Sequence, residues 1–299
     1  MLINMQEGLS ESNISFTNHD IAFVGEVLDR RGERAVEYIK SISNSLLQLD
    51  YDENEFTLNV DGTIINAERF DDYINSFKGK SIALETTTLG FVEIFYCCKA
   101  LFDNKFPKVT LLYLEPLEYK RSSRSQIMHR HDFDLSEEFA GFRAIPGATI
   151  MLSDRYSQRG VFLLGFEERR LDRALEDYQM IQTSKSAVVF GVPAFKAGWE
   201  MNSFANNIRV IRDKKLRGGV HFCGANNPLS TLELLNKCYN TLNTDERMFI
   251  SPIGTKPSGI GTILFVLEHS DVGILYDHPK QKSERSSEIS KWHMFEVDF

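Results

Sequence analysis

Residues near position 255 combine features that bind an anion. In the stretch ISPIGTKP (250–257), Gly254 lets the backbone turn closely, Thr255 offers a hydroxyl and Lys256 a positive charge. Pro257 suits the first turn of a helix, and the amino terminus of a helix favours negative charge. The stretch therefore predicts a phosphate or carboxylate site. It fits neither a Walker A loop nor GxGxxG, and a plain strand-to-helix turn with Lys256 in solvent is the alternative.

A second candidate is GFEERR (165–170). Gly165 follows an apolar run, and Arg169 and Arg170 stand on the first turn of an expected helix, where the helix dipole disfavours cations. Either a bound anion or local ion pairs with neighbouring glutamates, including Glu167, would compensate these charges. We expect this stretch and Gly254 to lie on the same edge of a sheet, because ligands of open α/β sheets bind beyond the carboxyl ends of the strands.

The third candidate follows the last expected strand. Asp277 and His278 are succeeded by Arg285 and Ser286, which together offer a carboxylate, an imidazole, a guanidinium and a hydroxyl. Such a set binds a nucleotide or performs acid/base catalysis, with Glu167, Asp277 or His278 as the acid or base, although a solvated loop is equally compatible with it.

Other reactive residues give weaker patterns. His129 and His131 would share one side of an extended segment, but no further cluster matches their spacing, so we expect neither a metal nor a cofactor. Cys97 and Cys98 stand in an apolar run and read as core thiols. Cys223 stands between an expected strand and a helix, where a lowered pKa would make it a nucleophile.

The same series of landmarks occurs twice. A strand followed by an Arg-Arg helix start, a turn opening an apolar helix, a Tyr-x-x-Pro step and an Arg-Ser-Ser triplet recur in the same order in each half. The pairs are 21–35 with 161–174, 83–90 with 250–261, 113–116 with 276–279, and 121–123 with 285–287. We interpret this as an internal duplication. Glu85 and three threonines replace the Gly-Thr-Lys stretch in the first copy, so the second should bind anions more strongly.

The alternation of apolar strands and helices predicts an α/β fold of two tandem Rossmann-like units with mainly parallel sheets, related by a pseudo-twofold. The expected parts are a flexible arm at 1–18, a first unit at 19–125, a connection at 126–160 and a second unit at 161–299. In the first unit we expect strands at 21–26, 56–60, 81–85 and 108–114 and helices at 30–48, 67–77 and 89–103. In the second we expect strands at 161–166, 186–191, 219–222, 248–251 and 272–276 and helices at 168–182, 198–207, 228–241 and 257–268, with 292–299 as an edge strand.

Composition narrows the class of protein. The chain has 299 residues, 42% of them hydrophobic and 25% charged, which is typical of a globular protein. A net charge of −8 argues against an extended nucleic-acid surface, since that binding depends on basic side chains. The four cysteines form no CxxC pair, and we find neither a signal peptide nor an apolar run long enough for a membrane span, so we expect a cytoplasmic protein.

The paired units, with the Gly254-Thr255-Lys256 turn opening a late helix, resemble the duplicated Rossmann-like ligand sensors of bacterial defence, the CRISPR-associated Rossmann (CARF) and SAVED families. The resemblance covers residues 20–290 at the level of architecture. It implies recognition of an oligonucleotide messenger in a cleft between the two units. Such sensors normally carry a fused effector, which this chain has no spare length to provide, so any response would pass through a partner protein.

Three functions follow as alternatives. The first is a regulatory module that binds a small phosphate-bearing ligand in the cleft, with a protein partner or a second copy of the chain; its contacts are Gly165, Arg169, Arg170, Gly254, Thr255, Lys256, Arg285 and Ser286. The second is a nucleotide-processing enzyme, a hydrolase or glycosidase. The third is a structural subunit of a larger defence complex.

Overall fold

The computed structural model describes residues 1–121, 133, 135–139, 141–150 and 155–299. It divides the chain into two compact units. Unit 1 comprises Met1–Tyr119 and Ser283–Phe299, and unit 2 comprises Lys120–Lys282. The expected boundaries at 125 and 161 therefore differ from the observed ones, because the last segment of the chain joins the first unit and most of the expected connection belongs to the second.

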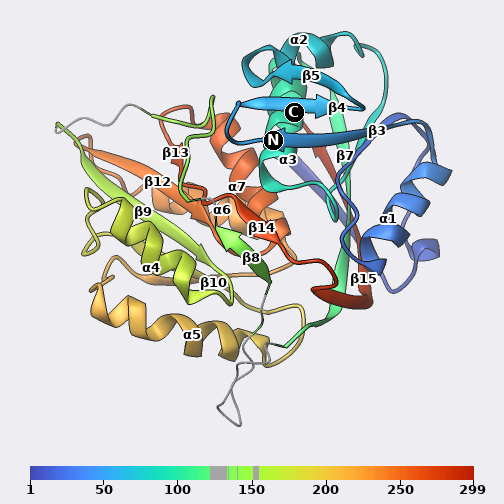
Figure 1. Ribbon diagram of the computed structural model, residues 1–299. Coiled ribbons are helices and arrows are strands. Elements are labelled where there is room, and N and C mark those ends of the chain that lie inside the picture. Colours follow the sequence, from blue (N-terminus) through green and yellow to red (C-terminus); the bar gives the residue numbers. More distant parts are fainter. Residues whose placement is uncertain (122–132, 134, 140, 151–154) are drawn as a thin grey trace. The chain divides into compact units, whose positions relative to one another are not determined.

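Unit 1 contains, within the described residues, an eight-stranded sheet in the order β1-β15-β7-β6-β2-β3-β4-β5 (Figure 1). The strands are β1 (Leu2–Gly8), β2 (His19–Val24), β3 (Ser43–Asp52), β4 (Thr57–Val60), β5 (Thr63–Asn66), β6 (Ile82–Glu85), β7 (Lys108–Tyr119) and β15 (Ser286–Asp298). The central strands β7, β6, β2 and β3 are parallel, whereas β1, β15, β4 and β5 pair antiparallel. The sheet is mixed, not mainly parallel throughout.

The helices of unit 1 cover both faces of this sheet (Figure 1). They are α1 (Arg30–Ser41), α2 (Phe70–Asn75) and α3 (Phe91–Asp103), with short 3₁₀ turns at Glu11–Asn13 and Ala67–Arg69. Helix α1 begins at Asp29, whose side chain accepts a hydrogen bond from Gly32 N at 2.9 Å. Its apolar face, with Ala35 and Ile39, packs on Ala22 and Val24 of β2.

Three sequence-based expectations for unit 1 are wrong. Residues 2–8 form strand β1, which pairs with β15 along its whole length, and therefore are no flexible arm. The carboxyl-terminal strand β15 lies between β1 and β7, so it is an interior strand and not an edge. The helix expected at 30–48 ends at Ser41, and β3 begins at Ser43.

Unit 2 contains, in its described part, a fully parallel five-stranded sheet in the order β11-β10-β9-β12-β13. The strands are β9 (Ser157–Leu164), β10 (Ala187–Gly191), β11 (Val220–Cys223), β12 (Glu246–Pro252) and β13 (Gly273–Ile274). The connecting helices are α4 (Glu168–Asp177), α5 (Trp199–Asp213), α6 (Pro228–Tyr239) and α7 (Lys256–Glu268). Numbered along the unit, the order is 3-2-1-4-5, that of a Rossmann-like sheet. A separate antiparallel pair joins β8 (Ser136–Phe139) to β14 (Pro279–Gln281).

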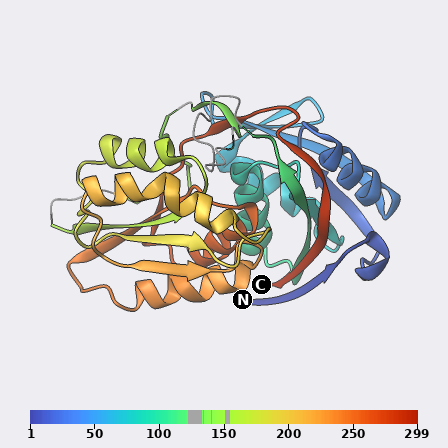
Figure 2. The ribbon, with the colours of Figure 1, turned by 90° about the horizontal axis from the view of Figure 1, so that it is seen from below.

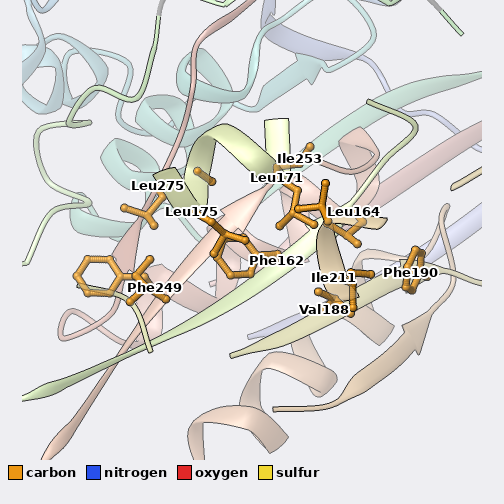
Figure 3. Packing of buried hydrophobic residues seen from close by; sticks show 13 residues of the cluster. Phe162, Leu164, Leu171, Leu175, Val188, Phe190, Ile211, Phe249, Ile253 and Leu275 are labelled. Atoms are coloured by element: carbon orange, nitrogen blue, oxygen red, sulfur yellow. The ribbon is translucent and has the colours of Figure 1, made fainter. Parts of the chain in front are cut away.

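Helices also cover both faces of the unit 2 sheet, with α5 and α6 on opposite sides in Figure 2. Figure 3 shows the core between the sheet and the α4–α5 layer, where Phe162 and Leu164 of β9 meet Leu171 of α4 and Ile211 of α5. On the other face Gly261 of α7 packs against α6 so closely that an added Cβ would lie 2.4 Å from a backbone oxygen. The α/β class predicted from the sequence is thus confirmed.

Candidate functional site in unit 2

The loops after β9 and β12 meet at the carboxyl edge of the unit 2 sheet. Strand β9 lies in the middle of the sheet. The chain continues from β9 to β10 on one side of it, and later adds β12 on the opposite side, so the direction of strand addition reverses between β9 and β12. Open α/β sheets bind ligands at this point. A Cβ added to Gly165 would lie 2.9 Å from the carbonyl oxygen of Ile253 and 3.7 Å from Cα of Gly254. Glycine at 165 therefore permits the contact between the two predicted stretches.

Helix α7 begins at this contact. Thr255 is its N-cap and accepts a hydrogen bond from Ser258 N, while its hydroxyl donates to the carbonyl of Ala225 in the loop after β11. Lys256 is the first residue of this thirteen-residue helix. The helix dipole and the lysine charge both favour a negative group here.

A hollow of about 40 Å³ lies beside Thr255 and extends over the ends of β9 and β10. This space accommodates a few water molecules or one small chemical group. Its lining combines glycines, aromatic rings and hydroxyls: Leu164, Gly165, Phe166, Gly191, Ala194, Phe195, Trp199, Glu200, Ser203, Ala225 and Thr255. A smaller hollow of about 10 Å³ adjoins Thr255 and Ser258.

Aromatic side chains gather at one side of the hollow. The ring of Phe133 lies 4.6 Å from that of Phe166 and 5.3 Å from that of Trp199. Phe166 and Trp199 are 6.0 Å apart, nearly perpendicular. Phe133 and Trp199 are buried, whereas Phe166 is half-buried, so Phe166 is the ring of this group with surface open to a ligand.

Polar residues of α5 hold the loop after β9 in place. Ser203 Oγ and Asn207 Nδ2 donate to the carbonyl of Gly165 at 2.8 and 2.9 Å, and Asn206 Nδ2 donates to that of Phe166 at 2.7 Å. Both asparagines are buried. The sequence analysis missed them, although polar residues at positions 203, 206 and 207 share one helix face and so signal buried hydrogen bonding.

Arg170 and Asp277 form a buried ion pair. Arg170 Nε and Nη2 donate to the two carboxylate oxygens of Asp277 at 2.7 and 2.6 Å, and Nη1 donates to the carbonyl of Ile253 at 3.1 Å. Burial opposes the arginine charge, but Asp277 more than offsets it and raises the pKa of Arg170. These contacts fix the loop after β12 to α4 and give both residues a structural role in place of the predicted ligand contact and acid/base function.

The remaining predicted residues of unit 2 lie in different surroundings. Glu167 accepts hydrogen bonds from the backbone and hydroxyl of Ser136 at 3.1 and 3.0 Å, so its carboxylate joins α4 to β8. Arg169 is exposed on α4. His278 has a left-handed backbone, with φ of 43°, and its ring packs against Tyr276 at 5.1 Å.

Arg285 and Ser286 belong to unit 1, so the structure of unit 2 does not include them. Their predicted place in one ligand site with Lys256 stays a prediction. His129 and His131 lie outside the described residues. Among the residues that are described, no three His, Cys, Asp or Glu side chains group as metal ligands.

The cysteines are all buried as free thiols. Burial raises the pKa of the Cys223 thiol. It raises the pKa of the Cys98 thiol to about 12. A thiol of raised pKa carries little thiolate at neutral pH, which argues against the predicted nucleophilic role of Cys223.

Comparisons with known proteins leave the family open. No family model and no curated protein sequence matches the chain. A periplasmic ribose ABC transporter protein from Conexibacter woesei aligns with 84% of this chain and 69% of its own, at 10% identity and a TM-score of 0.24. A ketoreductase domain from the bacillaene assembly line aligns with 90% of this chain and 70% of its own, at 12% identity and a TM-score of 0.21. In the described part of the chain, no helix combines the length and apolarity needed to cross a bilayer.

Proposed function

We propose that unit 2 is a binding module for a small phosphate-bearing ligand with a flat ring, of the nucleotide class. The observation that carries the proposal is the hollow at the reversal of strand order, bounded by Gly165, Thr255 and the aromatic pair Phe166 and Trp199. The start of α7 and Lys256 supply attraction for the anion. The ring of Phe166 supplies a stacking surface, worth about 1–3 kcal/mol per base in single-stranded nucleic-acid complexes.

Binding without catalysis agrees best with the carboxylates of this region. Glu200, which lines the hollow, accepts hydrogen bonds from Gly198 N at 3.2 and 3.1 Å. The carboxylates of Glu167 and Asp277 accept hydrogen bonds from Ser136 and Arg170, so neither has the freedom of a general base. The output of binding would pass to a protein partner or to a second copy of the chain. The role in bacterial defence implied by the resemblance to CARF and SAVED sensors belongs to this proposal as its biological setting.

We also infer that the two units descend from one duplicated unit. The strands at or beside the matching sequence landmarks follow the same spatial order, β7-β6-β2 in unit 1 and β13-β12-β9 in unit 2. Both series are parallel. The next strand in each sheet, β3 or β10, is connected to β2 or β9 through a helix, α1 or α4, with two adjacent arginines in its first turn. This agreement supports a common ancestor, because the repeat was identified from the sequence alone and the spatial order of the strands is independent of it.

Thermal unfolding with a ligand panel tests the binding function. Adenosine supplies a ring without phosphate, ribose 5-phosphate a phosphate without a ring, and AMP both. A ligand present at a hundred times its Kd adds about 2.7 kcal/mol of stability, which raises the Tm by about 5–10 °C in a unit of this size. We expect AMP to give a larger shift than either fragment.

Two variants identify the site. Lys256→Ala should weaken AMP binding by about tenfold or more, the usual effect of losing a hydrogen bond to a charged group. Lys237→Ala removes the same charge from the exposed face of α6, away from the hollow, and should leave binding unchanged. Equal shifts in both variants, or no shift with any nucleotide tried, would overturn the proposal.

A further inference from the structure

Unit 1 contains a second concentration of positive charge. Arg31, on the first turn of α1, is 3% exposed. Its Nη1 donates to the carbonyl of Leu114 at 2.6 Å, and its Nη2 lies 3.8 Å from the carboxylate of Asp29. Its Nε is buried and has no hydrogen-bond partner among the residues that the structure describes. An unsatisfied donor on a buried cation is costly, so its presence points to a missing acceptor.

Arg285 brings a second guanidinium to the same place. It directly precedes Ser286, which pairs in register with Tyr119 of β7. The Ser286 hydroxyl donates to Asp29 Oδ2, the same oxygen that lies 3.8 Å from Arg31 Nη2. Burial lowers the pKa of Arg285, and the nearby Arg31 charge lowers it further. Arg285 is half-buried, so the residue still meets solvent.

Among the described residues, one carboxylate serves both arginines. Asp29 is the carboxylate that acts on both, and it also accepts hydrogen bonds from Gly32 N and the Ser286 hydroxyl. Burial raises the pKa of Tyr113 and of Tyr119, so these neighbouring phenols stay neutral and cannot balance the charge. Two buried cations that share one carboxylate require a further anion.

We propose that Arg31 and Arg285 form an oxoanion site in unit 1, which takes inorganic phosphate or the phosphate group of a monoester. A tetrahedral oxoanion offers several acceptor oxygens to the planar donors of two guanidinium groups, and arginine binds phosphate in this way with high geometric specificity. The site is separate from the hollow of unit 2 and does not depend on the function proposed for it. It assigns a ligand to Arg285, one of the residues that the sequence singled out.

Calorimetric titration with inorganic phosphate tests the site, and ribose 5-phosphate in a second titration distinguishes free phosphate from a monoester. We expect Arg285→Met to weaken phosphate binding by about tenfold or more, since a charge-assisted hydrogen bond is lost. Arg30→Met is the matched control: it removes the same charge from the exposed first residue of α1. It should leave the Kd within about twofold, as expected for a solvated charge outside the site.

A measurement on the unmodified protein guards against a misfolded variant. Phenylglyoxal reacts with accessible arginines, and mass spectrometry locates the product. Phosphate should protect Arg285 and leave Arg30 reactive. The site is ruled out if phosphate protects neither arginine, or if Arg30→Met weakens binding as much as Arg285→Met. Phosphate binding that is lost in Lys256→Ala and kept in Arg285→Met would also rule it out, because the anion would then occupy unit 2 alone.

Discussion

The two units place opposite charges at the matching strand-to-helix turn. In unit 1, between β6 and α3, Glu85 accepts hydrogen bonds from Thr87 N at 2.7 Å and Thr88 N at 2.9 Å, and also from the Thr88 hydroxyl. In unit 2, between β12 and α7, the turn carries Lys256 and Thr255, with a hollow beside it. Unit 1 thus supplies an anion from its own chain where unit 2 presents a cation. A carboxylate of the chain itself therefore occupies the turn in unit 1, which is the role that the proposed function gives to an external anion in unit 2.

The first arginine helix of each unit shows a second difference. In both, an arginine side chain donates to a backbone carbonyl, Arg31 to that of Leu114 within β7 and Arg170 to that of Ile253 directly after β12. Arg170 also has a carboxylate of its own, in Asp277, whereas Arg31 shares Asp29 with Arg285. Among the described residues, Arg170 in unit 2 thus has a carboxylate to itself, whereas in unit 1 one carboxylate serves two arginines.

Breaking the balanced pair should give the largest effect. Asp277→Ala leaves Arg170 buried without its carboxylate, which should destabilise unit 2 by about 3–5 kcal/mol. Urea unfolding followed by circular dichroism measures this loss. Asp245→Ala, in an exposed loop of the same unit, is the control and should change stability by less than about 0.5 kcal/mol. A small effect of Asp277→Ala would mean that the pair does not hold the loop.

Removing the internal anion of unit 1 should give the next largest effect. Glu85→Ala takes away a buried carboxylate that accepts hydrogen bonds from two backbone amides, and we expect a loss of about 2–3 kcal/mol in unfolding free energy. Glu55→Ala, on an exposed turn of unit 1, provides the comparison. If the two variants were equally stable, the turn of unit 1 would not depend on its carboxylate.

Thr255→Val should lower stability less than either of these substitutions, and it should also weaken AMP binding. The loss of the N-cap of α7 costs about 1 kcal/mol. The variant also changes a side chain that lines the hollow, so AMP affinity should fall with it. The control is Thr241→Val, at a threonine beyond the end of α6. It measures the stability lost with a hydroxyl outside the site, and it should leave AMP affinity unchanged. Unchanged AMP affinity in Thr255→Val would place the ligand elsewhere.

The smallest expected effect is the pH dependence that His19 contributes in unit 1. Burial lowers the pKa of His19, whose Nε2 lies 3.0 Å from the Thr110 hydroxyl. The unfolded chain then binds a proton more readily than the folded chain, so stability should fall as the pH drops below the ordinary histidine value of about 6.5. His19→Gln should flatten this slope in urea unfolding. An unchanged slope in His19→Gln would assign it to other groups.

The second half of the fold was predictable because its signals are local. Four of the five strands in the parallel sheet of unit 2 are short runs followed by a helix, so periodicity located all of that sheet, although not the β8–β14 pair. Unit 1 was harder because its outer strands pair antiparallel with distant segments. β1 reads as a polar arm until β15, almost 300 residues away, is placed beside it. The alternation of Leu47, Leu49 and Tyr51 signals β3, but helix-forming residues before it hid the boundary.

The parts of the site that depend on the path of the backbone were predictable from the sequence. The parts that depend on contacts between distant side chains were not. Gly165 and Gly254 come together because parallel strands end on one edge, which the sequence allowed us to foresee. Trp199 and Phe133 reach the same place from segments whose order along the chain says nothing about their proximity. The pairing of Arg170 with Asp277, 107 residues apart, likewise depends on packing that no local pattern reveals.

The contrast between the two turns can be measured directly. Amide NMR spectra of the deuterated, ¹⁵N-labelled protein, recorded during titration with AMP, report on both turns in one experiment. We predict that the amides of Gly165, Gly254 and Thr255 shift with a common Kd, while those of Thr87 and Thr88 stay unchanged. Shifts at Thr87 and Thr88 without shifts at Gly254 and Thr255, or no shift at either turn, would contradict the account.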